Sequence, residues 1–302
     1  MPQLPPLPQI RQQVARALAE DVGSGDLTAS LLPAQAQAVG EVWCRESAVL
    51  CGSAWFNEVF HQLDPATAVA WQVHDGERVA AESLLCTVRG SARTLLTGER
   101  TALNLLQTLS ATATTAARYA AAVATTEVTL LDTRKTIPGL RLAQKYAVAC
   151  GGCHNHRVGL YDAILIKENH IIAAGSIAAA LQCAFSTHPG VEVEIEVENL
   201  EELQQALQAG AKRILLDNFS LEQLRQAVAI NQRRARLEAS GSLSLEQLPA
   251  IAATGVDDIS IGALTKHLTA IDLSMRFTIN PDRPGNSHTS SIQHVNLPPS
   301  KP

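Results

Sequence analysis

The chain has 302 residues, of which 46% are hydrophobic and 18% are charged, and its formal net charge is −5 at pH 7. This composition is typical of a soluble globular protein, and the length predicts about two domains. A sequence pI near 6.0 argues against binding to duplex nucleic acid, which needs a basic face, and 4% aromatic residues argue against a stacking surface for single strands.

The sequence also carries no signal for a membrane or for export. It has no apolar run close to the ~20 residues that cross a bilayer, and its N-terminus, MPQLPPLPQIRQQ, lacks the basic and apolar regions of a signal peptide. We therefore expect a cytoplasmic protein without a membrane partner, whose six cysteines stay reduced.

The first third of the chain predicts a small α+β domain. Residues 1 to about 10 are rich in proline and are expected to be extended or disordered. Residues 11–20 predict a short helix, and Ala54–Leu63 predicts another. Between residues 38 and 90, other short apolar stretches alternate with turn signals, which predicts antiparallel strands. Residues 91–124 predict one or two helices.

From Glu127 onward, short apolar runs alternate with helical segments. The predicted strands cover residues 128–131, 163–166, 191–197, 213–216, 235–239 and 257–261. This alternation predicts βαβ units and a parallel sheet. Six repeats are too few for a standard eight-stranded barrel, so an incomplete or variant barrel and an open doubly wound sheet both fit. The last apolar run, 271–279, is expected to return to the first domain, and residues 281–302 have the composition of a disordered tail.

Charged or small residues follow each predicted strand. They are Asp132–Lys135, Lys167–His170, Glu196–Asn199, Asp217–Asn218, Ser240–Ser242 and Gly262–Ala263. In both βα architectures the carboxyl ends of the strands meet at one edge and hold the site. The sequence therefore predicts a binding site assembled from these segments.

The segment from Asp132 to His170 is a basic cluster in an acidic chain. Its six cations (Arg134, Lys135, Arg141, Lys145, Arg157 and Lys167) outnumber its three anions (Asp132, Asp162 and Glu168) by three, and it also contains three histidines. Such a local cluster indicates an anionic ligand. Lys167 is interpreted either as a Schiff-base lysine or as a fixed cation, and the neighbouring arginines favour the cation.

An acidic group complements this cluster. Glu192, Glu194 and Glu196 alternate with apolar residues and so project from one face of their strand. That face is either solvated or turned into a cleft, where the basic cluster supplies partners. Glu196 and Asp217 end neighbouring strands and suit Mg²⁺ or ribose hydroxyls; a structural salt-bridge network is the alternative.

The remaining motifs each have a functional and a structural interpretation. Ser240–Ser242 and Gly262–Ala263 could bind a phosphate through backbone N–H groups or be ordinary turns. The Cys150–His154 segment, CGGCH, matches a haem or zinc pattern, but the expected absence of export and of a second cysteine pair favours a glycine turn. Arg100, on a predicted helix, is interpreted from the pattern alone as a solvated residue.

Taken together, these motifs resemble the quinolinate phosphoribosyltransferase family, the carboxylating nicotinate-nucleotide pyrophosphorylases. The resemblance runs from Glu20 to about Ile279 and rests on EDVGSGDLT, GERTALNLLQ, LDTRKTIPGLR, GGCHNHRVGLYDAILIKENH, EVEVENLEE, LDNF, LEASGS and ISIGALTKH. It implies an N-terminal α/β sandwich (residues 1–112, completed by 270–280), a seven-stranded α/β barrel (residues 113–269) and a homodimer or assembly of dimers.

The resemblance also implies roles for individual residues. Catalytic roles fall to Lys135, Lys167, Glu196 and Asp217; the substrate-binding set adds Arg100, Thr133, Arg134, His156, Arg157, Ser240, Gly241, Ser242, Gly262 and Ala263. Glu196 and Asp217 would hold Mg²⁺ and the ribose, and Arg100 would reach the site of the neighbouring subunit. The chain departs from the family pattern at Thr108, Ala111, Cys153 and Ser242; the last weakens the phosphate-loop assignment slightly.

The implied reaction transfers phosphoribose from phosphoribosyl pyrophosphate to quinolinate and releases CO₂ and pyrophosphate. Three alternatives remain at this point: the same fold acting on nicotinate or another acceptor, a Schiff-base lyase that uses Lys167, and a non-enzymatic anion-binding barrel.

Overall fold

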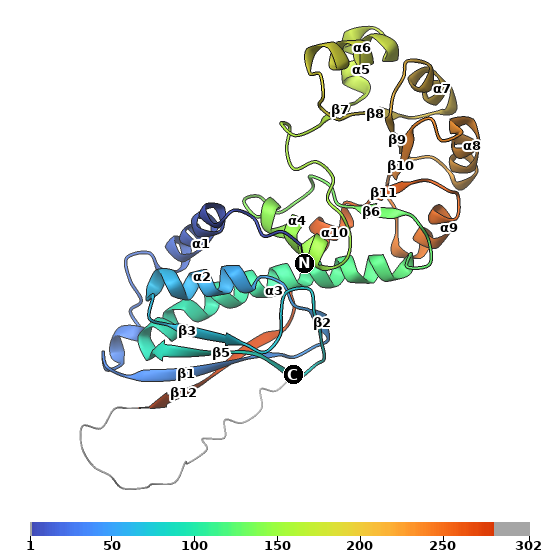
Figure 1. The fold of residues 1–302 in the computed structure, drawn as a ribbon. Coiled ribbons are helices and arrows are strands. Elements are labelled where there is room, and N and C mark those ends of the chain that lie inside the picture. Colours follow the sequence, from blue (N-terminus) through green and yellow to red (C-terminus); the bar gives the residue numbers. More distant parts are fainter. Residues whose placement is uncertain (1, 281–302) are drawn as a thin grey trace.

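The computed structural model describes residues 2–280, and Figure 1 shows two parts joined by one long helix. The first part contains a four-stranded antiparallel sheet in the order β12-β1-β5-β3. The second contains a six-stranded parallel sheet in the order β6-β11-β10-β9-β8-β7. The predicted mixture of antiparallel strands first and βα units afterwards is confirmed.

The antiparallel sheet packs its apolar face against helices. Its strands are β1 (Gln37–Cys44), β3 (Ala68–Trp71), β5 (Ser83–Ser91) and β12 (Leu273–Asn280); β2 (Ala48–Val49) and β4 (Arg78–Val79) form a separate pair. Along β1, Ala38, Val42 and Cys44 are buried while Glu41 is exposed, as period-2 burial requires. The last apolar run does return to the first part, because β12 pairs with β1 along its whole length.

Three helices cover this sheet: α1 (Leu7–Val22), α2 (Ser53–Leu63) and α3 (Ala92–Ala122), with a 3-10 turn, η1, at Ala29–Leu31. The expectation that the chain is extended or disordered to about residue 10 is wrong from Leu7 onward. Proline is tolerated in the first turn of a helix, and burial of Ile10, Val14 and Leu18 at a spacing of four docks α1 on the core.

One helix, α3, occupies the segment for which one or two were expected. It has 31 residues and continues through residue 112 from the first part to the second. Its buried residues run from Ala92 to Ala116. The residues that α3 presents at its C-terminal end therefore reach the parallel sheet.

The parallel sheet is wound in one direction. Its strands are β6 (Thr129–Leu131), β7 (Ile164–Ile166), β8 (Val193–Val197), β9 (Arg213–Asp217), β10 (Arg236–Ser240) and β11 (Asp258–Ser260), and each overlaps a predicted strand. Neighbours in the sheet are neighbours in the chain, except that β6 pairs with β11. The strand order does not reverse, so it is that of a barrel and not of a doubly wound sheet.

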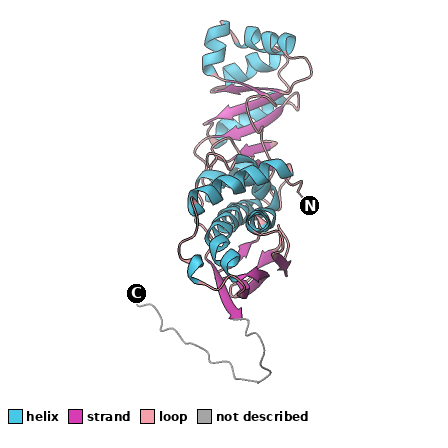
Figure 2. Cartoon of the chain, turned by 90° about the vertical axis from the view of Figure 1, so that its left-hand side faces the viewer, coloured by secondary structure: helices cyan, strands magenta, loops and turns pink. Residues whose placement is uncertain are grey.

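Within residues 2–280, this barrel order does not close through paired strands. β6 and β7 do not pair with each other, and the segment between them makes one parallel bridge, Leu131 to His154. Figure 1 shows the resulting arc of strands from β6 to β7, with helices outside it. In the view turned by 90°, the strands of this part lie in front of some of its helices (Figure 2).

The predicted helices between these strands are confirmed. They are α4 (Arg141–Cys150), α6 (Ile177–Thr187), α7 (Leu200–Gln208), α8 (Leu221–Asn231), and η2 (Leu245–Gln247) followed by α9 (Leu248–Ala252). Two further short helices, α5 (Glu168–Ala174) and α10 (Ala263–Lys266), begin directly after β7 and β11. No single helix among the described residues is long and apolar enough to cross a membrane; α5 and α6 reach that criterion jointly, across a 91° bend.

Candidate active site

The buried carboxylate of Asp132, directly after β6, organises the basic cluster. It accepts hydrogen bonds from Lys145 Nζ, from Asn155 Nδ2 (2.7 Å) and from the His156 backbone N–H (2.9 Å). Lys145 on α4 also donates to the His156 carbonyl at 2.9 Å. Burial raises the pKa of Asp132 and lowers the pKa of Lys145, and the attraction between the two charges opposes both shifts. Lys145 is therefore a structural cation of the cluster.

Arg141 is the second structural cation. Its guanidinium donates to Thr136 Oγ1 (3.1 Å) and to the Val158 carbonyl (3.2 Å). These contacts hold the loop after β6 against the loop that precedes β7. Two of the six cations thus build the site instead of facing a ligand.

Arg134 and Arg157 lie close together, and neither forms an ion pair with a carboxylate within residues 2–280. Burial, and then the charge of Arg134, lower the pKa of Arg157, which donates to the Ala163 carbonyl at 3.2 Å. Arg134 Nε is buried and has no hydrogen-bond partner among the described residues. Two adjacent guanidiniums with an unused donor suit a planar anion such as a carboxylate.

The acidic face of β8 turns toward these cations, as predicted for a cleft. Glu196 forms an ion pair with Lys167, and Glu194 bonds to His156 Nε2 at 2.8 Å. Glu192, at the start of the segment, stays mostly exposed, 4.0 Å from Arg213. Lys167 is 46% exposed and paired with a carboxylate, which does not favour the Schiff-base alternative, because that chemistry needs a desolvated lysine or a neighbouring cation.

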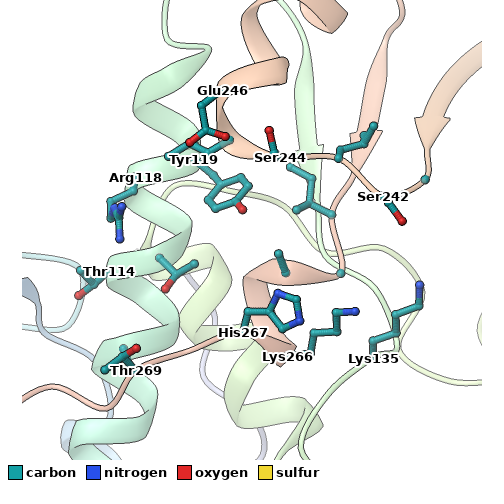
Figure 3. A pocket seen from close by; sticks show the side chains of 18 of the residues that line it. Thr114, Arg118, Tyr119, Lys135, Ser242, Ser244, Glu246, Lys266, His267 and Thr269 are labelled. Atoms are coloured by element: carbon teal, nitrogen blue, oxygen red, sulfur yellow. The ribbon is translucent and has the colours of Figure 1, made fainter. Parts of the chain in front are cut away.

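The loops after β9, β10 and β11 line one cavity of about 860 Å³ (Figure 3). Its lining includes the predicted residues Lys135, Asp217, Ser240, Gly241, Ser242, Gly262 and Ala263. Gly241 has φ +142°, and a Cβ there would lie 2.7 Å from Asn218 Oδ1, so only glycine fits. A Cβ at Gly262 would lie 3.1 Å from Lys135 Cδ and 3.7 Å from Thr133 Oγ1. Lys135 thus extends over the backbone of Gly262.

Three basic residues of this cavity were not predicted. Arg118 on α3, and Lys266 and His267 at the end of α10, line this cavity together, and all three are labelled in Figure 3. Lys266 and His267 belong to the segment ISIGALTKH and follow Gly262 by four and five residues. Because they lie so close to the end of a predicted strand, the sequence could have predicted that they belong to the site. Arg118 gave no such signal, because its place depends on how α3 packs.

Arg100 lies outside this cavity. It is exposed on α3, eleven residues before Ala111, the first residue of α3 that lines the cavity. At about 1.5 Å rise per residue this places it about 16 Å away along the helix axis. Arg100 is therefore not part of this cavity within one copy of the chain.

The CGGCH segment is a close-packed turn. Cys150 and Cys153 are buried free thiols, and Cys153 Sγ donates to the Ala116 carbonyl at 3.4 Å. A Cβ at Gly151 would overlap the Ala113 carbonyl and the Ala116 side chain, so glycine lets α4 end against α3. Among the described residues, metal-ligand spacing occurs instead at His156, Glu194 and Glu238, where Arg213 already contacts both carboxylates.

The fold and the site define a βα protein whose basic and small residues gather at the carboxyl ends of its parallel strands. Residues 26–110 match the model of the quinolinate phosphoribosyl transferase N-terminal domain, and residues 112–276 match that of its C-terminal domain. The chain belongs to the quinolinate phosphoribosyl transferase family.

Relatives cover nearly the whole chain. The nicotinate-nucleotide pyrophosphorylase [carboxylating] of Mycobacterium leprae is 42% identical over 88% of this chain and 96% of its own length. The probable enzyme of the same name from Bacillus subtilis is 37% identical over 90% of this chain and 94% of its own. The solved structure of the nicotinate-nucleotide pyrophosphorylase from Francisella tularensis is 46% identical, with a TM-score of 0.88 over 91% of this chain and 98% of that one.

The contacts of Asp132 predict how much stability the protein loses when Lys145, the ion partner of Asp132, is replaced. Lys145→Met leaves a buried carboxylate without its ion partner, and we expect a loss of about 3–5 kcal/mol in the free energy of unfolding. Asp132→Asn/Lys145→Met should recover part of that loss, because the unpaired charge is gone while an oxygen remains for Asn155. Urea denaturation of both single variants and the double variant measures the coupling, and additive effects would contradict the assignment.

Proposed function

We propose that this chain transfers phosphoribose from phosphoribosyl pyrophosphate to quinolinate, with decarboxylation to nicotinate mononucleotide, in NAD biosynthesis. The observation that carries the proposal is the convergence of two complementary groups at one edge of the parallel sheet. Arg134, Arg157 and Lys167 come from the segments around β6 and β7, and the cavity with Asp217 and the glycine loops lies at the ends of β9, β10 and β11. Family membership over residues 26–276 supports the same reaction.

Quinolinate carries two adjacent carboxylates, which need closely spaced cations. Arg134 and Arg157 provide two guanidiniums, with Arg134 Nε buried and unpaired. Lys167 adds a third cation, which Glu196 holds in place. The ligand's carboxylates would neutralise charges that repel each other in the free protein.

Phosphoribosyl pyrophosphate fits the cavity beside these cations. The backbone at Gly241 and Gly262 is open to a phosphate, and Lys135, Arg118 and Lys266 supply positive charge around it. Asp217, held by Asn218 Nδ2 at 2.8 Å, suits the ribose hydroxyls. In this proposal the 5-phosphate lies between β10, β11 and α3.

Glu196 and Asp217 are the residues that would hold Mg²⁺. They end the adjacent strands β8 and β9, are neither fully buried nor fully exposed, and offer the carboxylate oxygens that Mg²⁺ prefers. When bound, the ion neutralises charge on the departing pyrophosphate. Glu196 would then share its carboxylate between Lys167 and the ion.

The chain's own side chains orient the two reactants. Arg134 and Arg157 hold the pyridine dicarboxylate so that its ring nitrogen faces the anomeric carbon, while the glycine loops fix the 5-phosphate. The N–C bond forms as the C–O bond to pyrophosphate breaks, which leaves a pyridinium. Its positive charge promotes loss of the 2-carboxylate as CO₂, and the electron pair left on the ring carbon takes up a proton. No covalent bond to the protein is required.

A second copy of the chain completes this proposal. We propose a homodimer or an assembly of dimers in which Arg100 enters the partner's site, since Arg100 is exposed and remote from its own cavity. Leu160 and Tyr161 lie in the loop beside Arg157 and expose 74% and 81% of their surface. Large apolar side chains at the rim of a site suit contact with another subunit.

Three further features belong to the same proposal. The segment at His154, which bridges to Leu131, would serve as the seventh strand of the barrel. Residues 1–112 with 270–280 would act as the sandwich domain and 113–269 as the barrel. The cytoplasm is the proposed location. The expectation of a disordered tail at 281–302 concerns residues outside the described part of the chain.

Nicotinate is the alternative acceptor. It has one carboxylate, so the two guanidiniums of Arg134 and Arg157 would leave unneutralised positive charge around it. The protein incubated with Mg²⁺, phosphoribosyl pyrophosphate and one acceptor should release CO₂ and form mononucleotide with quinolinate and give no mononucleotide with nicotinate. Chromatography of the products and trapping of CO₂ measure this; turnover of nicotinate alone would refute the proposed acceptor.

Hybrid assemblies test the sharing of Arg100. Arg100→Ala and Arg157→Ala should each lose at least about tenfold in kcat/KM, because each removes a cation from the charged site. After the two inactive variants are unfolded together and refolded, about a quarter of wild-type activity should return, since each mixed dimer contains one intact site. A mixture that remains as inactive as either variant refolded alone would contradict a shared site.

A further inference from the structure

A layer of buried charges lies below the strand ends that form the site. Glu194 is two residues before Glu196 on β8, about 6.6 Å deeper in the sheet. Glu194, Glu238 and Asp258 expose 2%, 0% and 1% of their surface. Arg213 joins all three carboxylates at 3.2, 2.7 and 2.9 Å, respectively, and Arg236 pairs with Asp258.

His156 connects this layer to the substrate cations. Its Nε2 lies 2.8 Å from Glu194 and 3.6 Å from Glu238. Its Nδ1 lies 2.7 Å from the backbone nitrogen of Arg157. A backbone N–H can only donate, so Nδ1 accepts and the ring hydrogen sits on Nε2, where it is donated to Glu194. The ring in this arrangement is neutral.

The charges of the layer then require one more proton. Three carboxylates face two guanidiniums, Arg213 and Arg236, so the layer carries −1 with a neutral ring. An uncompensated buried charge costs several kcal/mol. Burial and the charge of Glu194 raise the pKa of Glu238 to about 7, and they outweigh the charge of His156 and the hydrogen bonds of Ser260 and Arg213, which lower it. Glu238 Oε1 has no hydrogen-bond partner among the described residues, which leaves that oxygen free to carry the proton.

His156 competes for the same proton. Burial lowers the pKa of His156, but the hydrogen bond to Glu194 and the charges of Glu238 and Glu194 outweigh it, so the net shift is upward. The groups that face the ring are Glu194 from β8, Arg213 from β9 and Glu238 from β10, while Asp132 and Lys145 bond to its backbone. A proton on Nδ1 would point at the Arg157 N–H and break that contact. The contact between His156 Nδ1 and the Arg157 N–H therefore favours the state in which Glu238, and not His156, carries the proton.

We propose that Glu238 is a positioning residue: it holds the one proton of this layer, so that neutral His156 accepts the Arg157 N–H and fixes the Arg157 guanidinium for the substrate dianion. The inference rests on the proposed function, because it concerns how that substrate is held. When Glu238 loses its proton to solvent, a net negative charge lies below the dianion. When Glu238 passes the proton to His156, Arg157 loses its support. Either event weakens quinolinate binding.

The pH dependence of KM for quinolinate tests this role. In the wild type, KM should rise about fivefold from pH 7 to pH 8, as expected when one group with a pKa of about 7 releases its proton. Glu238→Gln keeps the shape and the neutral state, so its KM should stay constant over that range with kcat near the wild-type value. Glu192→Gln, the same change at a mostly exposed glutamate near Arg213, is the matched control and should retain the wild-type rise.

A measurement on the wild type complements the variants. In ¹⁵N-histidine-labelled protein at pH 6.5, His156 should show an unprotonated Nδ1 and a protonated Nε2, with its signals identified by their loss in His156→Asn. An imidazolium at His156, or the same rise of KM in Glu238→Gln as in the wild type, would overturn the inference. Absence of quinolinate turnover by the wild type would instead refute the proposed function.

Discussion

The carboxylate of Asp132 is the constraint on which the rest of the site depends. It is fully buried and lies between Lys145 of α4, Asn155 and the backbone of His156. These contacts bring the segment after β6 and the segment before β7 together, although their own cations repel each other. Arg134 can lie near Arg157 because the neighbouring ion pair and backbone hydrogen bonds hold both loops in place.

The site has two layers with different charge balance. In the lower layer Glu194, Glu238 and Asp258 are matched by Arg213, Arg236 and one proton. In the upper layer Lys167 is paired with Glu196, but Arg134 and Arg157 have no carboxylate partner in the part of the chain that the structure describes. The rigid, balanced layer thus supports a positively charged one. Positive charge that the protein itself leaves unmatched is what an anionic substrate can neutralise.

The sequence predicted most of the fold and of the site because both depend on local patterns. Period-2 and strand–helix alternation located the six parallel strands, and the rule that strand ends meet at one edge placed Lys135, Asp217, Gly241 and Gly262 in one cavity. The features that the sequence did not predict depend on contacts between distant parts of the chain. α1 begins at Leu7 because its apolar face docks on the core, and the place of Arg118 depends on where α3 packs.

The roles of individual cations were also beyond sequence reasoning. Lys145 and Arg141 are the same residue types as Lys167 and Arg157, yet they bind Asp132 and loop carbonyls. His156 is of a residue type that can bind an anionic ligand, but its side chain bonds to the Glu194 carboxylate. Only the three-dimensional arrangement distinguishes cations that stabilise the site from cations that face a ligand. A lysine or an arginine has the same hydrogen-bond donors in either role, so the residue type alone does not reveal the role.

The cations Arg134 and Arg157, which have no carboxylate partner among the described residues, are proposed to bind two adjacent carboxylates of one ligand. Titration calorimetry of the protein with quinolinate and with nicotinate, at equal ionic strength and without a second substrate, tests this proposal directly. The account predicts that quinolinate binds at least about tenfold more tightly, since a charge-assisted hydrogen bond contributes about 1.5–3 kcal/mol. Equal affinities, or tighter binding of nicotinate, would contradict it.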